Sequence, residues 1–538
     1  MQKIHLLITF LAAQLNLQAQ QINIVKTTIV GNKKGTACKM IYPTSDGGIF
    51  WAGNTGDTAG GGDFPVCTGS AKQSNRKASG RIDANGDMVW ARVYCDGLPQ
   101  LPGNCLPSDD SFLIVGPGIS NSSNQIVPDI YVARLDCEGN LRQQYQWGSS
   151  KADGAAIVIP ASDGGFLTVG SSYGNDGDIP VHYIPSFPTS FQFRDVVAIK
   201  ADSLGQKQWV KVIGSSTEDG CDNAFQVGDA FYLFVDTDGS HDYDFINSAP
   251  YPPDSSGSYL VKINGQGNLV WSRCVGSLGV NDALFDEQDS TFMIVSGASK
   301  FPPFYFNNQG NGSYTNYGLA KIDLQGQVKW AKNYGSIGYH DIPTGVCKVA
   351  GGNGYMVVGE THGETHPSPP RIGQSDGWMV WVDTLGNQIA DKYFGSAEYE
   401  SGIRVTNLGN RYVISTGGVY SNKPFTEGAW HYNPGVDYGV ALTVIELWPT
   451  SVTEVGGRQG ILEAYPNPAH DKLTILLPKE DRNYRIEVYD NAGTTVSSFQ
   501  IKNQVSIVLN ISSWTLGNYT VICKGTQQTW SSKVIIGH

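Results

Sequence analysis

One segment of the chain gathers the carboxylates that a hard cation prefers. It reads Asp-Thr-Asp-Gly-Ser-His-Asp-Tyr-Asp and runs from residue 236 to residue 244. Acids grouped in a Gly-containing loop are typical calcium ligands, although the segment lacks the spacing and the bidentate Glu of an EF-hand. Weaker versions occur at residues 175–178 and 57–63, so solvated turn acids are the alternative. The candidate calcium ligands are Asp236, Asp238, Asp242 and Asp244.

Aromatic residues are concentrated in several long segments that separate apolar stretches. Such rings could stack against sugars or hold a peptide. The alternative is that they pack these segments onto the rest of the fold. The candidate ligand platform consists of Tyr183, Phe187, Phe301, Phe304, Tyr305 and Trp430. No motif singles out catalytic residues.

The elements that position these residues form an internal repeat. One half of the repeat is an apolar strand, a turn that ends in Gly, and a strand that carries Trp or another aromatic residue. Its six turn glycines lie 53 to 66 residues apart, at Gly86, Gly139, Gly205, Gly267, Gly326 and Gly386. The other half is an Asp-Gly turn followed by an apolar strand, as at residues 45–53 and 162–170. Each complete unit predicts four antiparallel strands, which suits a propeller blade.

The two ends of the repeat predict how the structure closes. A seventh outer half at residues 437–445 has no fourth strand after it, while residues 22–31 match such a strand. An N-terminal strand that completes the last blade removes two exposed sheet edges. The sequence therefore predicts an all-β fold with a seven-bladed β-propeller over residues 20–448, closed by the N-terminal strand.

Recurrence also separates structural residues from functional ones. A Trp occupies the fourth strand of four repeats and is expected to pack between blades, at Trp90, Trp209, Trp271 and Trp330. An acid opens five repeats, at Asp153, Asp219, Asp282, Asp341 and Glu400. We expect these acids to cap turn amides, and a ring of acids that binds cations is the alternative.

A different pattern begins after the repeat. Residues 449–460 contain Pro and Gly and predict a linker. Residues 461–538 contain short apolar strands and predict a small β-sandwich domain. Several motifs follow in order: Tyr-Pro-Asn-Pro from Tyr465, Leu-Thr-Ile from Leu473, and Val-Tyr-Asp-Asn-Ala-Gly from Val488. Leu-Gly-Asn-Tyr-Thr from Leu516 and Lys-Val-Ile-Ile from Lys533 complete the series.

This series resembles the type A sorting domain of the type IX (Por) secretion system of Bacteroidetes. The resemblance covers about 80 residues and implies export to the periplasm, passage through the outer membrane by the type IX machinery, and removal of the domain near the linker. The repeat also resembles secreted Asp-Gly-Gly propellers of that phylum, a likeness that names no activity.

The first residues and the net charge bound the location and the partners. Lys3, an apolar stretch and a run of small and polar residues predict a cleavable signal peptide over residues 1–19. No later apolar run has the length of a transmembrane helix. The net charge of −12 argues against a nucleic-acid partner.

Two hypotheses of function follow. The first is a secreted or cell-surface binding module for glycans or proteins, without catalysis and with calcium as a candidate cofactor. The alternative is an extracellular hydrolase or lyase that acts on carbohydrate or peptide. A close pair of acids inside one deep pocket would favour the enzyme, and a shallow aromatic surface without acids of perturbed pKa would favour binding.

Overall fold

The computed structural model places most of the chain in β-strands, in two compact units. One unit comprises residues 22–446, and residues 447–538 belong to the other. The structure describes residues 20–536 except 33–34, 57–61, 65–75, 95–105, 109–110, 121–126, 182, 184–192, 239–240, 247–255, 277–278, 299–314, 336–338, 353, 363–374, 397–399, 410, 421–428, 432–437, 450–458, 467–468, 478–482, 491–494, 516 and 526–528.

The larger unit begins with three antiparallel sheets of four strands each, in which the strands follow in chain order. The first sheet contains β2 (Thr36–Pro43), β3 (Ile49–Thr55), β4 (Arg76–Ile82) and β5 (Met88–Tyr94). The second sheet contains β6 (Leu106–Ser108), β7 (Ser111–Ser120), β8 (Val127–Asp136) and β9 (Leu141–Trp147). The third sheet contains β10 (Asp153–Pro160), β11 (Phe166–Ser172), β12 (Asp195–Ala201) and β13 (Lys207–Ile213).

Three further sheets repeat this order. The fourth sheet contains β14 (Asp219–Val227), β15 (Ala230–Thr237), β16 (Gly257–Ile263) and β17 (Leu269–Gly276). The fifth sheet contains β18 (Val280–Asp286), β19 (Thr291–Ala298), β20 (Asn316–Asp323) and β21 (Val328–Tyr334). The sixth sheet contains β22 (Asp341–Lys348), β23 (Tyr355–Thr361), β24 (Asp376–Val382) and β25 (Gln388–Phe394). The prediction of an all-β fold made of such sheets is confirmed.

The last sheet of this unit joins its two ends. Its strands lie in the order β26 (Ser401–Asn407), β27 (Tyr412–Tyr420), β29 (Tyr438–Pro449), β1 (Gln20–Asn32) and β28 (Ala429–His431). The N-terminal strand β1 is hydrogen-bonded to β29 on one side and runs parallel to β28 on the other. Strand β28, which pairs with the outer edge of β1, was not predicted from the sequence.

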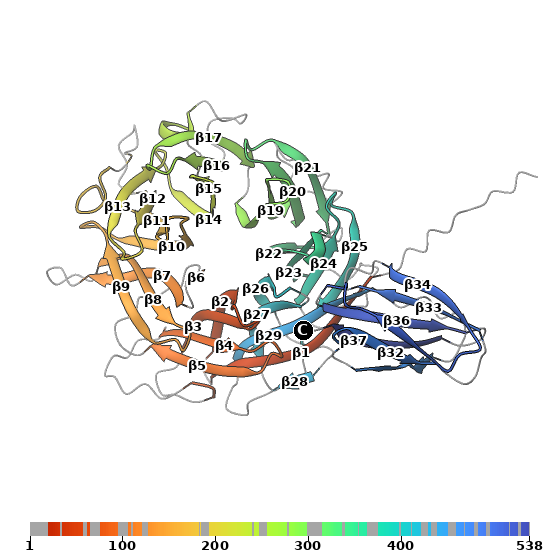
Figure 1. Cartoon of the computed structure of the whole chain (residues 1–538). Coiled ribbons are helices and arrows are strands. Elements are labelled where there is room, and N and C mark those ends of the chain that lie inside the picture. Colours follow the sequence, from red (N-terminus) through yellow and green to blue (C-terminus); the bar gives the residue numbers. More distant parts are fainter. Residues whose placement is uncertain are drawn as a thin grey trace, which may run out of the picture. The chain divides into compact units, whose positions relative to one another are not determined.

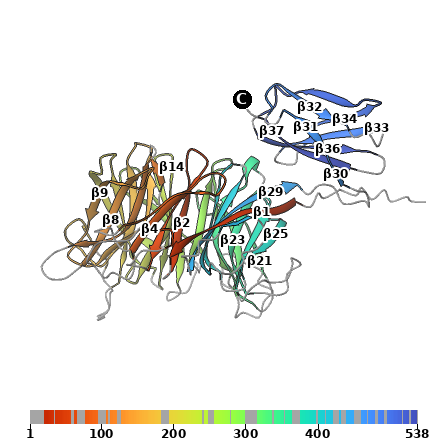
Figure 2. The same ribbon diagram turned by 90° about the horizontal axis from the view of Figure 1, so that it is seen from below.

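The sheets of the larger unit lie around a common centre, with the first strand of each sheet innermost (Figure 1). The first strand of each sheet contacts the first strand of the next, and β26 of the last sheet contacts β2 of the first. Figure 2 shows the same strands running between the two faces of the unit. We use the term connection face for the side where one sheet passes to the next and where the second and third strands of a sheet are joined.

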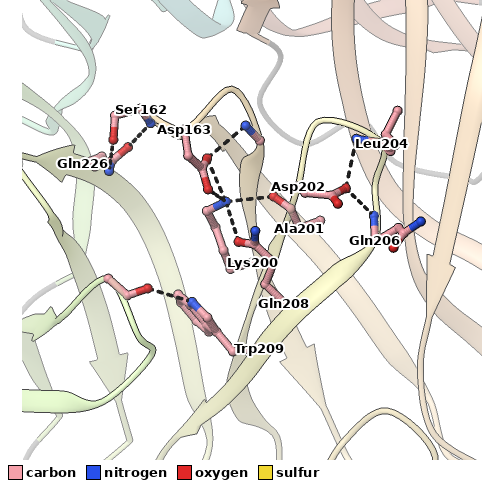
Figure 3. A network of polar contacts seen from close by, with 12 residues as sticks. Ser162, Asp163, Lys200, Ala201, Asp202, Leu204, Gln206, Gln208, Trp209 and Gln226 are labelled. Atoms are coloured by element: carbon pink, nitrogen blue, oxygen red, sulfur yellow. Dashed lines mark hydrogen bonds and ion pairs between the residues drawn. The ribbon is translucent and has the colours of Figure 1, made fainter.

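Tight turns on the opposite face explain why the Gly positions recur. Asp202 accepts hydrogen bonds from the amides of Leu204 (2.9 Å) and Gln206 (2.8 Å), as Figure 3 shows. Gly205 in the same turn has a φ of 77°, which Gly adopts without steric conflict. The same pair of amide contacts is made by Asp83, Asp136, Asn264, Asp323 and Asp383.

The tryptophans of the fourth strands connect neighbouring sheets. Trp209 donates from Nε1 to the carbonyl of Gly265, 3.0 Å away, in the turn of the fourth sheet (Figure 3). Trp90 makes the equivalent bond to Cys137, and Trp330 makes it to Thr384. The predicted packing role is confirmed for these three residues.

The smaller unit has eight strands among its described residues. They are β30 (Gln459–Ile461), β31 (Glu463–Tyr465), β32 (Lys472–Leu476), β33 (Asn483–Tyr489), β34 (Thr495–Lys502), β35 (Ser506–Asn510), β36 (Gly517–Lys524) and β37 (Thr529–Ile536). They form a five-stranded sheet in the order β30-β37-β36-β33-β34 and a three-stranded sheet in the order β31-β32-β35. Side chains of both sheets share one apolar core, which includes Leu473, Ile475, Ile486 and Val534.

Candidate functional site

On the connection face, carboxylates cap the turn that leads from the second sheet into the third. Ser149 N lies 2.6 Å from Asp153 Oδ2, where Asp153 opens β10. Gly148 N donates to Asp178 (3.1 Å), and Ser150 N donates to Asp176 (2.7 Å). Three successive amides, which have no strand partner, thus each receive a charged acceptor.

The turn from the third sheet into the fourth repeats this arrangement. Ser215 N donates to Asp219 Oδ2 at 2.6 Å. Gly214 N donates to Asp244 (3.2 Å), and Ser216 N donates to Asp242 (2.8 Å). Two of the four candidate calcium ligands therefore hold a turn about 30 residues earlier in the chain, and Lys211 Nζ lies 3.7 Å from Asp244.

The other two candidate calcium ligands have different surroundings. Asp236 lies near Asp222. Burial is the main cause that raises the pKa of Asp236 well above its ordinary value, and the neighbouring carboxyl of Asp222 is the second. Asp238 is exposed and lies 3.5 Å from Ser256 Oγ. Within the described part of the chain, no three His, Cys, Asp or Glu side chains come together in a way that could hold a metal ion. Calcium binding stays a prediction.

An aromatic pair lies beside these capped turns. Tyr183, from the loop between β11 and β12, stacks on Tyr243, from the loop between β15 and β16, with ring centroids 4.8 Å apart and planes inclined by 29°. Tyr183 N donates to Asp195 Oδ2 at 2.7 Å, which fixes the backbone beneath the ring. Burial, then the carboxylates of Asp244 and Asp195, raise the pKa of Tyr183, so its hydroxyl stays protonated at neutral pH.

Apolar side chains near the pair in sequence are open to solvent. Tyr243 is 44% exposed, and Ile246, at the end of the short 3-10 helix η1 (Tyr243–Phe245), is 58% exposed. Val181, two residues before Tyr183, is also exposed. We call Val181, Tyr183, Tyr243 and Ile246 the tyrosine patch.

Tyr243 has an unusual backbone. Its φ is 46°, in the left-handed region that residues with a Cβ seldom adopt. The equivalent position of the third sheet, between Asp176 and Asp178, holds Gly177 with a φ of 59°. The backbone at this position of the repeat therefore favours Gly. A Tyr here costs about 1 to 2 kcal/mol of conformational free energy.

Five other residues were predicted for the ligand platform. Phe187, Phe301, Phe304 and Tyr305 lie outside the described residues. Trp430 lies in β28, opposite Thr27 of β1 in the last sheet, so the structure separates its backbone from Tyr183 on the third sheet. Tyr243 was not predicted from the sequence, because it lies between Asp242 and Asp244, which were interpreted as metal ligands. The sequence feature that could have identified it is a bulky residue at the position where the neighbouring repeat has Gly.

The acids that open the sheets, and Asp195 at the start of β12, are buried beneath this face. Asp195 and Asp219 are each 1% exposed, and burial raises the pKa of Asp219 to about 8, with a smaller contribution from Asp195. Asp153 and Glu400 also accept bonds from turn serines, at Ser149 and Ser396. The predicted capping role is thus confirmed for Asp153, Asp219 and Glu400. These carboxyls are buried and already accept hydrogen bonds from the turns.

Comparison with protein families identifies one region of the chain. Residues 463–537 match the model of a secretion system C-terminal sorting domain. The chain therefore carries a sorting domain, which implies recognition by secretion machinery and a secreted or cell-surface location. No helix among the described residues meets the length and hydropathy required to span a membrane. No curated protein matches the chain in sequence.

Several solved structures are similar to the chain at a low level. A puromycin hydrolase mutant is 11% identical with a TM-score of 0.43, and the match covers 82% of this chain and 58% of the hydrolase. The β-propeller domain of the Trilobed protease from Pyrococcus furiosus is 8% identical with a TM-score of 0.38, covering 71% of this chain and 90% of that domain. The C-terminal WD40 domain of Sif2 is 11% identical with a TM-score of 0.34, covering 79% and 96%. Such distant likenesses say nothing about activity.

Proposed function

We propose that the larger unit is a seven-bladed β-propeller that works outside the cell as a non-catalytic binding module for glycans or proteins. In this proposal the sheets are the blades, and β1 completes the last one beside β29. Contacts between the first strands of consecutive sheets, including β26 with β2, support a closed ring. The proposed boundaries are a signal peptide at 1–19, the propeller at 20–448, a linker at 449–460 and a sorting domain at 461–538.

The tyrosine patch is the proposed contact surface. The observation that carries it is Tyr243, which keeps an exposed ring on a backbone that favours Gly. Strain of this kind persists where the side chain has a use. Two stacked rings, with exposed Ile246 and Val181 close to them in sequence, offer aromatic and apolar side chains of the kind on which a sugar ring or a peptide side chain packs.

The state of the acids favours binding over catalysis. A general acid or base has to reach the substrate within hydrogen-bond distance. Asp195 and Asp219 are buried, and Asp242 and Asp244 are occupied by turn amides. A hydrolase or lyase on carbohydrate or peptide is the alternative, and it would need acids other than these.

Export is the second part of the proposal. The sorting domain is proposed to engage the type IX machinery of a Bacteroidetes cell after a signal peptide has directed the chain to the periplasm. The match over residues 463–537 supports this assignment. The machinery is thus one partner, and an extracellular glycan or protein is the other.

Glycan-array binding by the purified protein, with and without calcium, tests the proposal. Tyr243→Ala and Tyr243→Gly are expected to lose about tenfold or more of the affinity for any ligand found, since a stacked ring contributes on the order of 1 to 3 kcal/mol. Leu204→Ala is the matched control, because Leu204 is exposed in a turn on the opposite face. Unchanged binding in both Tyr243 variants would remove the patch from the proposal.

Two further readouts separate the alternatives. Cleavage of a bound glycan or peptide would favour the enzyme. A calcium requirement that disappears in Asp238→Asn would support a cation at Asp236, Asp238, Asp242 and Asp244; binding that is indifferent to calcium would count against it.

A further inference from the structure

Among the described residues, Lys77 is a buried cation without an anionic partner. It lies in β4 of the first sheet and is 5% exposed. Its Nζ donates to Asn54 Oδ1 at 2.6 Å, and Asn54 is itself buried. An amide oxygen carries no net charge, so the described residues do not compensate the charge of the ammonium.

The other buried lysines of the described chain are paired. Lys200 Nζ lies 2.8 Å from Asp163 and also donates to Gln208 and to the carbonyl of Ala201 (Figure 3). Lys321 forms an ion pair with Asp289. The fold thus supplies a carboxylate wherever the repeat itself buries a lysine, and Lys77 departs from this rule.

The repeat does not require a cation at the position of Lys77. Lys77 pairs with Asn54, the residue before the end of the second strand of its sheet. The equivalent residues of the third, fourth and sixth sheets are Val196, Ser258 and Gly377. None of them ionises, so packing of the blades does not account for Lys77.

A second cation lies nearby. Lys39 stands at the irregularity between Cys38 and Met40 in β2, and its side chain is exposed. Burial and, to a smaller extent, the charge of Lys39 lower the pKa of Lys77 to about 7. Two ammonium groups repel each other, and one of them is also buried. A negative charge that binds between or beside them stabilises the charged form of both.

The neighbouring side chains define the surroundings of this pair. Because side chains alternate along a strand, Asn54 shares a face of β3 with Phe50 and Ala52. These two pack with Phe112 and Ile114 of the second sheet. Lys77, directly opposite Asn54, therefore lies between the first and second sheets, at the end of β4 that is nearer to the connection face.

We propose that Lys77, Asn54 and Lys39 bind the oxyanion group of a small ligand, a carboxylate, sulfate or phosphate. The ammonium of Lys77 contributes charge-assisted hydrogen bonds, Asn54 Oδ1 orients that ammonium, and Lys39 adds charge from the solvent side. The site is on another sheet than the tyrosine patch, and the proposal does not depend on the proposed function.

The test measures binding of defined anions to the purified full chain at constant ionic strength. Sodium galacturonate probes an acidic sugar, galactose is its neutral control, and sodium sulfate and phosphate probe the free inorganic ion. Calorimetry gives the affinity, and the unfolding temperature reports stabilisation by the ligand. We expect galacturonate, sulfate or phosphate to bind and galactose to be inert; a response to galacturonate alone identifies the acidic sugar as the source.

Three variants assign the site. Lys77→Met keeps the volume of the side chain and removes the charge, and is expected to weaken anion binding about tenfold to a hundredfold. Lys39→Met is expected to weaken it about twofold to fivefold, because Lys39 is exposed and screened. Lys151→Gln removes an exposed lysine just before β10 of the third sheet, and this variant should bind the anion as the unaltered protein does. Tyr243→Ala should also bind the anion normally.

Nuclear magnetic resonance of the Lys77 side chain supplies a readout that does not depend on the variants folding. The bound anion stabilises the ammonium, so the pKa of Lys77 should rise when the ligand is present. The proposal is overturned if no anion binds more tightly than chloride, if Lys77→Met retains the original affinity, or if the titration of Lys77 does not change with ligand.

Discussion

Asp219 gives a prediction about stability that depends on pH. Burial raises its pKa from the ordinary 3.8 to about 8. Below pH 4 both the folded and the unfolded chain hold this proton. Between pH 4 and pH 8 the unfolded chain loses it while the folded chain keeps it, so the free energy of unfolding falls as the pH rises and the loss is complete above pH 8.

The size of the effect follows from the displacement of the pKa. At about 1.4 kcal/mol for each pKa unit, the change from 3.8 to about 8 corresponds to roughly 6 kcal/mol. A unit of about 425 residues has an unfolding entropy near 0.9 kcal/mol per degree, so this is about 6 °C in the unfolding temperature.

Asp219→Asn isolates this contribution. The amide stays neutral, its oxygen can accept from Ser215 N as the carboxyl does, and its NH₂ can donate to the hydroxyls of Ser215 or Thr237. We expect the variant to match the unaltered protein at pH 4 and to unfold about 6 °C higher at pH 8 to 9. Calorimetric unfolding scans from pH 4 to pH 9 measure both curves.

Asp163→Asn is the control of opposite sign. Burial acts to raise the pKa of Asp163, but the hydrogen bonds from Lys200 and from the amide of Gly165, together with the charge of Lys200, outweigh it and hold the pKa below its ordinary value. This variant should therefore lose stability at pH 8 and approach the unaltered protein at low pH. If Asp219→Asn is less stable than the unaltered protein at pH 8, the carboxylate is the native form and the reasoning from burial fails.

Other substitutions test the turns, the inter-sheet contacts and the patch. Trp209→Phe removes the hydrogen bond from Nε1 to the carbonyl of Gly265 and should lower the free energy of unfolding, measured in denaturant, by about 1 kcal/mol. The described contacts include no such bond for Trp271, so Trp271→Phe should lose less free energy of unfolding through hydrogen bonding. Gly205→Ala places a methyl group on a residue with a φ of 77° and against the ring of Tyr145, so it should lower the free energy of unfolding by about 2 kcal/mol or more; Gly164→Ala, with a φ of 83° and open space around it, reports the backbone part alone. Tyr243→Gly should keep or raise the unfolding temperature while it weakens ligand binding, and a loss of stability would show that the ring has a structural role.

The fold could largely be predicted from the sequence because its determinants are local. The turn of Asp202 and Gly205 closes within five residues, and the same chemistry recurs in every turn of this type. Repeated spacing of Trp90, Trp209 and Trp330 then indicated that equivalent strands meet equivalent neighbours. The motifs at the C-terminal end were likewise sufficient to identify the sorting domain.

The candidate sites could be predicted only in part. Tyr183 was selected from its aromatic surroundings, and the Asp236–Asp244 segment from its charge. Neither selection contained the partners: Asp242 and Asp244 meet the amides of Ser216 and Gly214, and Tyr183 meets Tyr243 from the next sheet. The sequence of a loop rich in acids is the same whether its carboxylates bind a cation or accept hydrogen bonds from turn amides, so the sequence does not distinguish the two roles.

The sequence by itself determined the repeat, its turns, the succession of strands and the exported character of the chain, because each depends on residues a few positions apart. The tertiary structure decided which side chains from different sheets share a surface. It stacked Tyr183 on Tyr243, placed β28 along β1, and left Lys77 with Asn54 as its hydrogen-bond partner. These outcomes depend on the register and packing of neighbouring sheets. Register and packing are fixed only when segments that lie far apart in the sequence come together in the folded chain.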